Sequence, residues 1–301
     1  MGKGFESWKT QGKMKIALVY NRECENTTGV HLQKVIENAK ISCDHFWTER
    51  FSQIPKGYDL YFRIDHGDYK YDLPQYLRPA VFYAIDTHLK KPYKKIKKQV
   101  GHYQVVFCAQ KQGADRLRKE TRVDTQWVPL GFDPQVHRKL DIEKKYNIGF
   151  IGSEARKFLR GQLIDVLRKK YPDSHIGGAD FRKISEIYSA SKIGFNYSIV
   201  NDINMRIFEI MACGSFLLTN RIKNNGFFEL FQEGKHLRTY SNQAQLLELV
   251  EYYLNHDQER EKIAQAGREL VVNNYTYYHT VQKMFNYLAF KFGGDFNRLR
   301  I

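Results

Sequence analysis

The sequence contains no apolar run long enough to cross a lipid bilayer, and no basic segment followed by an apolar one opens the chain. A membrane-spanning or secreted protein is therefore not expected. Cysteine is scarce, and Cys24, Cys43, Cys108 and Cys213 have no paired spacing, which argues against a disulfide framework or a zinc knuckle. Cys108 and Cys213 lie in apolar runs and are expected to be small core residues. We expect a cytoplasmic location.

Motifs that would define other enzyme classes are also missing. There is no G-x-G-x-x-G pattern, which disfavours a dinucleotide-dependent oxidoreductase, and no D-x-D metal motif. Asp65-His66-Gly67-Asp68 brings two carboxylates and an imidazole together, which is a weak metal signal. We interpret it as a polar glycine turn, with a loop that contacts a substrate as the alternative. No metal site is expected.

Acidic residues are fewer than basic ones. The chain has 48 Lys and Arg residues but 33 Asp and Glu residues, so its formal net charge is +15. The positive electrostatic potential of such a chain attracts phosphates on nucleotides, nucleic acids, teichoic-type polymers or anionic lipids. The densest basic run extends from Lys90 to Lys98 (KKPYKKIKK). It is either a solvated face or a patch that contacts a substrate or the surface of a membrane. Specific nucleic-acid binding is the weaker interpretation, because no recognised binding motif accompanies the charge.

A chain of 301 residues is long for one core and sufficient for two domains. Residues 1–13 are polar and aperiodic, and we interpret them as a disordered tail or a remnant of cloning. Strands are expected at residues 15–20, 45–48, 58–64, 80–85, 105–109 and 126–130, and helices at 29–40, 93–99 and 111–119. Strands that alternate with helices indicate βαβ units and a mainly parallel sheet.

A polar connection at residues 134–145 precedes a second series of the same kind. Strands are expected at residues 146–151, 175–178 and 193–197, and helices at 160–170, 181–189, 246–254, 257–272 and 280–292, with Asp257 as a helix N-cap. We therefore divide the chain into a first domain (14–140), a second domain (141–275) and a final helical segment (276–301).

Residues 201–220 (NDINMRIFEIMACGSFLLTN) are the most informative stretch. The apolar residues at helical spacing are Ile203, Ile207, Ile210 and Met211. Gly214 then favours the end of the helix, and a short apolar run typical of an inner strand follows. Glu209 is unusual, because a buried carboxylate is costly unless it reaches solvent or meets a donor in a cleft. Periodicity alone favours an ordinary salt bridge or a solvent-facing side chain.

Arg206-Ile207-Phe208-Glu209, Ala212-Cys213-Gly214 and Leu217-Leu218-Thr219 resemble the donor-site segment of the retaining group-1 glycosyltransferases. The form is most similar to the branch that includes the CgeB-like spore proteins. The resemblance implies an α/β protein with the GT-B fold, in which the parallel sheets of two Rossmann-like domains face each other across a cleft. It also implies that residues 14–140 form the acceptor-side domain, that residues 141–275 form the nucleotide-sugar-binding domain, and that the C-terminal helix in residues 276–301 packs back on the first domain.

The resemblance assigns Glu209 to the ribose hydroxyls of a nucleotide-sugar, a role that suits a carboxylate because it can accept from both hydroxyls. The family carries a second Glu eight positions earlier, at the sugar ring, where this chain has Asn201 with Asp202 beside it. In the first domain, Asp86 and His88 follow a strand and resemble the catalytic neighbourhood over the donor sugar. Their other interpretation is local capping of that strand end.

The remaining candidates are expected to bind the donor. A small-residue turn followed by basic residues can offer backbone N–H groups and charge to a pyrophosphate, and a helix N-terminus can do the same. Arg206 in a first helical turn is unfavourable towards the helix dipole, which suggests that it meets an anion. The donor-site residues predicted in this way are Gly152, Ser153, Arg156, Arg160, Gly177, Ser198, Asn201, Asn204, Arg206 and Glu209.

These features predict a glycosyltransferase that moves a sugar from a nucleotide-diphosphate sugar, with retention and without metal. A UDP-sugar is the expected donor, and no separate cofactor is expected. The acceptor is open: an anionic polymer, a lipid-linked acceptor and a protein all remain. Two other interpretations stay open, namely a catalytically inactive structural or nucleotide-binding protein of the same fold and a basic nucleic-acid-binding protein.

Overall fold

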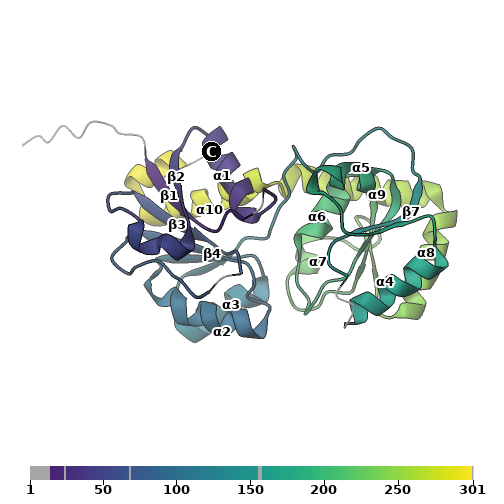
Figure 1. Ribbon diagram of the computed structural model, residues 1–301, viewed down its shortest axis with the longest axis horizontal. Coiled ribbons are helices and arrows are strands. Elements are labelled where there is room, and N and C mark those ends of the chain that lie inside the picture. Colours follow the sequence, from purple (N-terminus) through teal and green to yellow (C-terminus); the bar gives the residue numbers. More distant parts are fainter. Residues whose placement is uncertain (1–13, 24, 68, 155–157, 300) are drawn as a thin grey trace, which may run out of the picture.

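The computed structural model describes residues 14–299 and 301, except residues 24, 68 and 155–157. Two α/β domains lie side by side, each built on a parallel sheet (Figure 1). The tail interpretation of residues 1–13 and the candidate Arg156 both lie outside the described residues. Three cysteines are described, and Cys108 and Cys213 are fully buried as small core residues, as expected.

The first domain contains a six-stranded parallel sheet in the order β2-β1-β3-β4-β5-β6. Its strands are β1 (Lys15–Val19), β2 (Ser42–Phe46), β3 (Leu60–Ile64), β4 (Ala80–Ala84), β5 (Val105–Cys108) and β6 (Thr125–Trp127). The inner strands β3, β4 and β5 are buried at every residue, which explains why their sequences are apolar except for Arg63 of β3.

The sequence predictions for the two edge strands of this sheet, β2 and β6, begin and end too far towards the C-terminus. β2 pairs with β1 from Ser42 to Phe46, whereas residues 45–48 were expected, and a 3-10 helix (Thr48–Gln53) follows it. β6 ends at Trp127, whereas residues 126–130 were expected. Edge strands are only half buried, so their apolar alternation is weak and hydrogen-bonding register sets their limits.

Helices cover both faces of the first sheet (Figure 1). Helix α1 (Thr28–Asn38) packs on one face, whereas α2 (Lys90–Gln99) and α3 (Lys111–Thr121) pack on the other. Helix α2 contains the basic run and buries only Tyr93 and Ile96. Its lysines therefore form an exposed surface, and Lys97 pairs with Glu120 of α3 at 2.9 Å.

The second domain has a five-stranded parallel sheet in the order β11-β10-β9-β7-β8. Its strands are β7 (Tyr146–Ile151), β8 (His175–Gly177), β9 (Ser191–Asn196), β10 (Phe216–Asn220) and β11 (Arg238–Tyr240). Its helices are α4 (Leu159–Lys170), α5 (Ile184–Ser189), α6 (Met205–Ala212), α7 (Phe227–Leu230), α8 (Gln243–Asn255) and α9 (Asp257–Asn274), with a 3-10 turn (Phe181–Lys183) before α5.

Three local features of this domain differ from the sequence predictions. Helix α7 and strand β11 were not predicted, because four and three residues are too short to establish a period. Asp257 is the first residue of α9 and not its N-cap, which is His256. The Asp257 carboxylate instead pairs with Arg260 one turn later, at 2.5 Å.

The chain crosses between the domains twice, and the two crossings lie side by side. Phe132 N donates to Tyr275 O at 3.1 Å, and Tyr277 N donates to Phe132 O at 2.9 Å. We call residues 131–137 and 275–277 the hinge. After the second crossing, α10 (Tyr277–Phe292) packs against α1 of the first domain (Figure 1), so the C-terminal helix returns as expected.

Candidate active site

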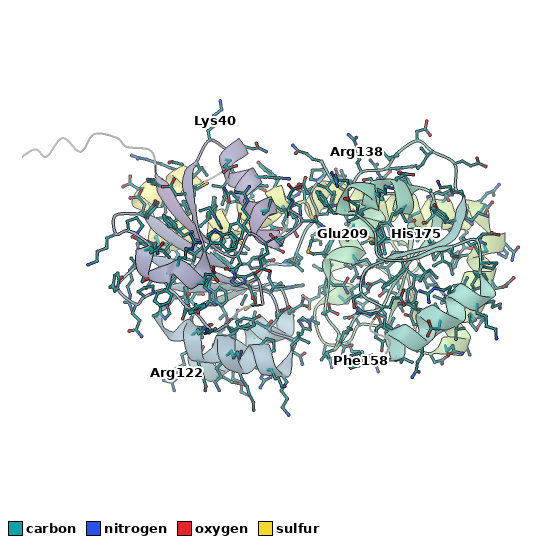
Figure 2. The ribbon with its side chains drawn as sticks, in the orientation of Figure 1. Lys40, Arg122, Arg138, Phe158, His175 and Glu209 are labelled. Carbon is teal, nitrogen blue, oxygen red and sulfur yellow. The ribbon has the colours of Figure 1, made fainter. Side chains whose placement is uncertain are left out.

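A cavity of about 470 Å³ lies where the two domains meet. Residues that follow β4 and β5 of the first sheet face residues that follow β9 of the second, so the carboxyl ends of both sheets contribute. Figure 2 marks Glu209 on the side of the second domain that faces the first. The lining residues are Asn26, Ile85, Asp86, His88, Leu89, Gln110, Leu130, Arg160, Ile199, Asp202, Asn204, Met205, Arg206 and Glu209.

Six of the predicted site residues line this cleft. Asp86 and His88 come from the first domain, and Arg160, Asn204, Arg206 and Glu209 come from the second. Gly152 lies directly behind Arg206. Ser153, Gly177, Ser198 and Asn201 do not line the cavity.

Asn201 is turned away from the cleft. Val200 and Asn201 both have left-handed backbone, with φ of 55° and 60°, and this kink directs Asn201 to the other side of its loop. Its Oδ1 accepts from Lys223 N at 3.0 Å, and it lines a separate cavity of about 340 Å³ beside Tyr240. The sequence prediction that Asn201 lies in the donor pocket is therefore not supported by its position.

The next residue, Asp202, lines the cleft instead of Asn201. Ser198 Oγ donates to Asp202 Oδ1 at 2.8 Å and contacts Asp202 O at 2.6 Å, which fixes the loop. Ser198 is 2% exposed, so it shapes this loop from within and does not face the cavity. The sequence placed Asp202 beside the site but did not choose it, because periodicity cannot reveal a left-handed kink.

Arg206 is held by the ends of two strands. Its Nε donates to Ile151 O at 2.8 Å and its Nη1 donates to Asn196 Oδ1 at 3.1 Å, while the guanidinium lies over the Phe150 ring. These bonds explain how a cation is tolerated in the first turn of α6. They leave Nη2 beside Gly152, at the edge of the cleft.

Arg160 lies near Arg206, and neither guanidinium makes an ion pair with a carboxylate among the described residues. Burial and the neighbouring charge of Arg206 both lower the pKa of Arg160, with Asp202 acting in the opposite direction. Its buried Nε has no hydrogen-bond partner among the described residues. Two guanidinium groups that repel each other in a cleft are suited to an anion with more than one charge.

On the opposite wall, Asp86 and His88 have shifted pKa values. Burial, together with the charges of Asp65 and Asp202, raises the pKa of Asp86 to about 6. Burial lowers the pKa of His88, although Asp202 opposes this, and His88 Nδ1 is buried without a hydrogen-bond partner in the described part of the chain. A neutral imidazole with a free nitrogen can donate to or accept from a bound hydroxyl.

Asp65 is a structural residue of that wall. Its carboxylate accepts from Gly67 N at 3.0 Å, from Tyr69 Oη at 2.9 Å and from Ile85 N at 2.9 Å. The turn interpretation of residues 65–67 agrees with this geometry, and Asp68 lies outside the described residues. No group of three or more possible metal ligands occurs within the residues that the structure describes.

Glu209 is 8% exposed, and its carboxylate lies near a histidine that the sequence analysis missed. His137 Nε2 lies 3.4 Å from Glu209 Oε1, and the His137 side chain is fully buried. His137 belongs to the hinge, in a segment whose sequence suggested only a polar connection. No periodicity marks it, and only the fold brings it to residue 209.

Comparison with known proteins agrees with this architecture. Residues 138–286, just under half of the chain, match the family model described as Glycosyl transferase-like. No curated protein matches the chain in sequence.

Solved structures are similar over almost the whole chain. Anabaena Alr3699/HepE in complex with UDP and glucose matches with a TM-score of 0.65 and 14% identity, over 92% of this chain and 99% of that one. Sucrose-phosphate synthase from Thermosynechococcus elongatus matches with a TM-score of 0.65 and 11% identity, over 93% and 99%. A glycosyltransferase from Rickettsia africae matches with a TM-score of 0.58 and 11% identity, over 94% and 99%. The expected GT-B fold is thereby confirmed.

None of the helices in the described ranges combines the length and apolar character needed to traverse a bilayer.

Proposed function

We propose that this protein is a glycosyltransferase that uses a nucleotide-diphosphate sugar as its donor. The observation that carries the proposal is the cleft itself, in which Arg160, Arg206 and Glu209 face Asp86 and His88. The match of residues 138–286 to a Glycosyl transferase-like family supports the same reaction class. Anabaena HepE, which has a similar fold, was solved with UDP-glucose, which supports a UDP-sugar as the donor.

Each wall of the cleft has a distinct task in this proposal. The two arginines neutralise the diphosphate, whose negative charge grows as the sugar–phosphate bond breaks. Glu209 accepts hydrogen bonds from the ribose hydroxyls. Asp202 accepts from hydroxyls of the transferred sugar in place of Asn201, which the loop directs elsewhere.

Transfer proceeds with retention and without metal. The bond between the anomeric carbon and the phosphate oxygen breaks, and its electron pair stays on the diphosphate. The acceptor hydroxyl attacks from the same face, and its proton passes to the departing phosphate oxygen. His88 lies on the first-domain wall, where its neutral imidazole binds a sugar hydroxyl, and Asp86 lies beside it.

The first test is a thermal-shift panel with UDP, GDP, TDP, ADP and CMP. A ligand that binds only the folded state raises its melting temperature, so we expect a rise with a nucleoside diphosphate and a smaller one with CMP. Arg160→Gln should reduce the rise, whereas Arg182→Gln should not, because Arg182 is exposed and pairs with Asp180 at 2.6 Å. Equal shifts in all three proteins would remove Arg160 from the site.

The second test is turnover, measured as nucleotide released from UDP-sugars. Glu209→Gln should reduce it strongly, because the amide both loses charge and offers one acceptor oxygen instead of two. Nucleotide binding without any Glu209-dependent turnover would favour the catalytically inactive alternative. Absence of nucleotide binding, with steeply salt-dependent binding to DNA or RNA, would favour the nucleic-acid alternative.

We further propose that the acceptor side contacts an anionic membrane surface through α2. Five of its exposed lysines have no ion-pair partner among the described residues: Lys90, Lys91, Lys94, Lys95 and Lys98. Clustered lysines bind anionic headgroups without inserting. Co-sedimentation with vesicles of phosphatidylglycerol and phosphatidylcholine, at low and high salt, tests this. Binding should fall when Lys94 and Lys95 become Glu, and unchanged binding would contradict the proposal.

A further inference from the structure

A line of buried polar side chains crosses the hinge and ends at Glu209. It begins in the first domain with Asn26 and His31, continues through Asp133 and His137 of the hinge, and reaches α6 of the second domain. His31, Asp133, His137 and Glu209 are each less than 10% exposed. The line runs through one of the two chain segments that join the domains and reaches the cleft at Glu209.

The first half of the line is tightly hydrogen-bonded. His31 Nε2 lies 2.9 Å from Asn26 Oδ1, and His31 Nδ1 lies 3.0 Å from Asp133 Oδ2. Burial alone would raise the pKa of Asp133, but hydrogen bonds from His31 and Gln135 N lower it to about 2. The Asp133 carboxylate is therefore ionised and fixed, and the hinge loop is anchored to α1.

The second half fixes the orientation of His137. Asp133 N donates to His137 Nδ1 at 3.3 Å, so Nδ1 is the acceptor nitrogen of the ring. Burial lowers the pKa of His137, although Glu209 opposes this, so the ring is neutral and carries its proton on Nε2. The Nε2 atom lies 3.4 Å from Glu209 Oε1, and its N–H has no aligned hydrogen-bond partner among the described residues.

We infer that His137 is a positioning residue that sets the Glu209 carboxylate for the ribose of the donor nucleotide. The inference rests on the proposed function. The His137 ring engages Oε1 and leaves Oε2 and the remaining lone pairs for the two ribose hydroxyls. Movement of Glu209 onto the ribose shortens the contact to His137 into an aligned hydrogen bond.

The competing role for His137 is purely structural, because its Nδ1 also caps the hinge loop at Asp133 N. The two roles differ in a measurable way. A positioning residue acts only on ligand atoms that Glu209 contacts, whereas a structural residue weakens every ligand alike. Removal of one ribose hydroxyl separates these effects.

The experiment compares the dissociation constants of UDP and 2′-deoxy-UDP by calorimetry. The wild type should bind UDP about tenfold more tightly, since a hydrogen bond to a charged group is lost with the hydroxyl. His137→Phe keeps a ring but has no N–H, so UDP binding should weaken about tenfold and the preference over 2′-deoxy-UDP should shrink towards one. His137→Gln places an amide N–H near the former Nε2 and should restore the preference to within about threefold of wild type.

His137→Asn supplies the second comparison if the phenylalanine variant does not fold. Its side chain can still accept from Asp133 N but is too short to reach Glu209, so it too should lose the preference for UDP. A preference that persists in folded His137→Phe or His137→Asn overturns the inference, even if both ligands bind more weakly. A wild type that binds no UDP refutes the proposed donor, and a wild type that binds both ligands equally refutes the ribose role of Glu209.

Discussion

Arg206 Nη2 occupies the space in which a side chain at position 152 would begin. A Cβ on Gly152 would lie 2.3 Å from that atom, and the backbone there has a φ of 144°. Gly152 therefore permits the approach that places this guanidinium at the edge of the cleft. The turn after β7 and the first turn of α6 depend on each other through this contact.

Gly152→Ala should displace Arg206 and weaken nucleotide binding. If the guanidinium meets the diphosphate, the loss of one charge-assisted contact raises the dissociation constant for UDP about tenfold or more. Titration calorimetry measures this. Gly178→Ala is the matched control, because no atom lies within 4 Å of its Cβ position. Unchanged UDP affinity in Gly152→Ala would separate Arg206 from the diphosphate.

Asp202→Asn should impair binding of the sugar and not of the nucleotide. The variant keeps the size of the side chain but loses the charge that strengthens hydrogen bonds from sugar hydroxyls. We expect the dissociation constant for UDP-glucose to rise about tenfold while that for UDP stays within about twofold. Asn201→Gly, which tolerates the positive φ, should leave both constants unchanged. Parallel losses for the two ligands would contradict this division of roles.

The pKa of Asp86 predicts a pH-dependent stability. Its pKa is raised from 3.8 to about 6, so the folded protein binds this proton more tightly than the unfolded chain does. The resulting stabilisation is complete below pH 3.8 and is lost as the pH rises through 6. Asp86→Asn removes the titration and should therefore be more stable than wild type above pH 6, by at most about 3 kcal/mol.

Melting temperatures of wild type and Asp86→Asn between pH 4 and 8 test this. The difference should widen with rising pH, because all other groups titrate equally in both proteins. Asp141→Asn is the control, since Asp141 is exposed and has no ion pair among the described residues. A difference that stays constant across the range would contradict the raised pKa.

The fold was largely predictable from the sequence, because inner parallel strands and amphipathic helices carry strong local periodicity. The central helix and the return of the final helix were predicted in this way or from the family resemblance, and the structure contains them. Asp86 and His88 were found because they follow a strand, and chain direction in a parallel sheet brings strand ends to one edge.

The contacts that fix the site were not predictable, because they join segments far apart in the chain. His31, His137 and Glu209 meet only when the hinge forms. Asp202 lines the cleft and Asn201 does not, because the backbone is left-handed at Val200 and Asn201, neither of which is a glycine. Such a conformation is set by the surrounding loop, where Asn225 Nδ2 donates to Asn201 O at 2.8 Å, and not by local preference.

Gly131 should be essential for the hinge. A Cβ at this position would lie 2.7 Å from Tyr275 O and 2.8 Å from Thr276 C, both backbone atoms of the returning chain. Backbone cannot move aside as a flexible side chain can, so Gly131→Ala must separate the two crossings or distort the hydrogen bonds between Phe132 and residues 275 and 277.

We expect Gly131→Ala to lose about 1–3 kcal/mol of stability in denaturant unfolding. UDP affinity should fall as well, because His137 belongs to the displaced segment and contacts Glu209 of the second domain. Gly101→Ala, where no atom lies within 4 Å of the Cβ position, should change neither quantity. Wild-type stability in Gly131→Ala would show that the two crossings can move apart without cost, and the packed hinge would then not hold the domains together.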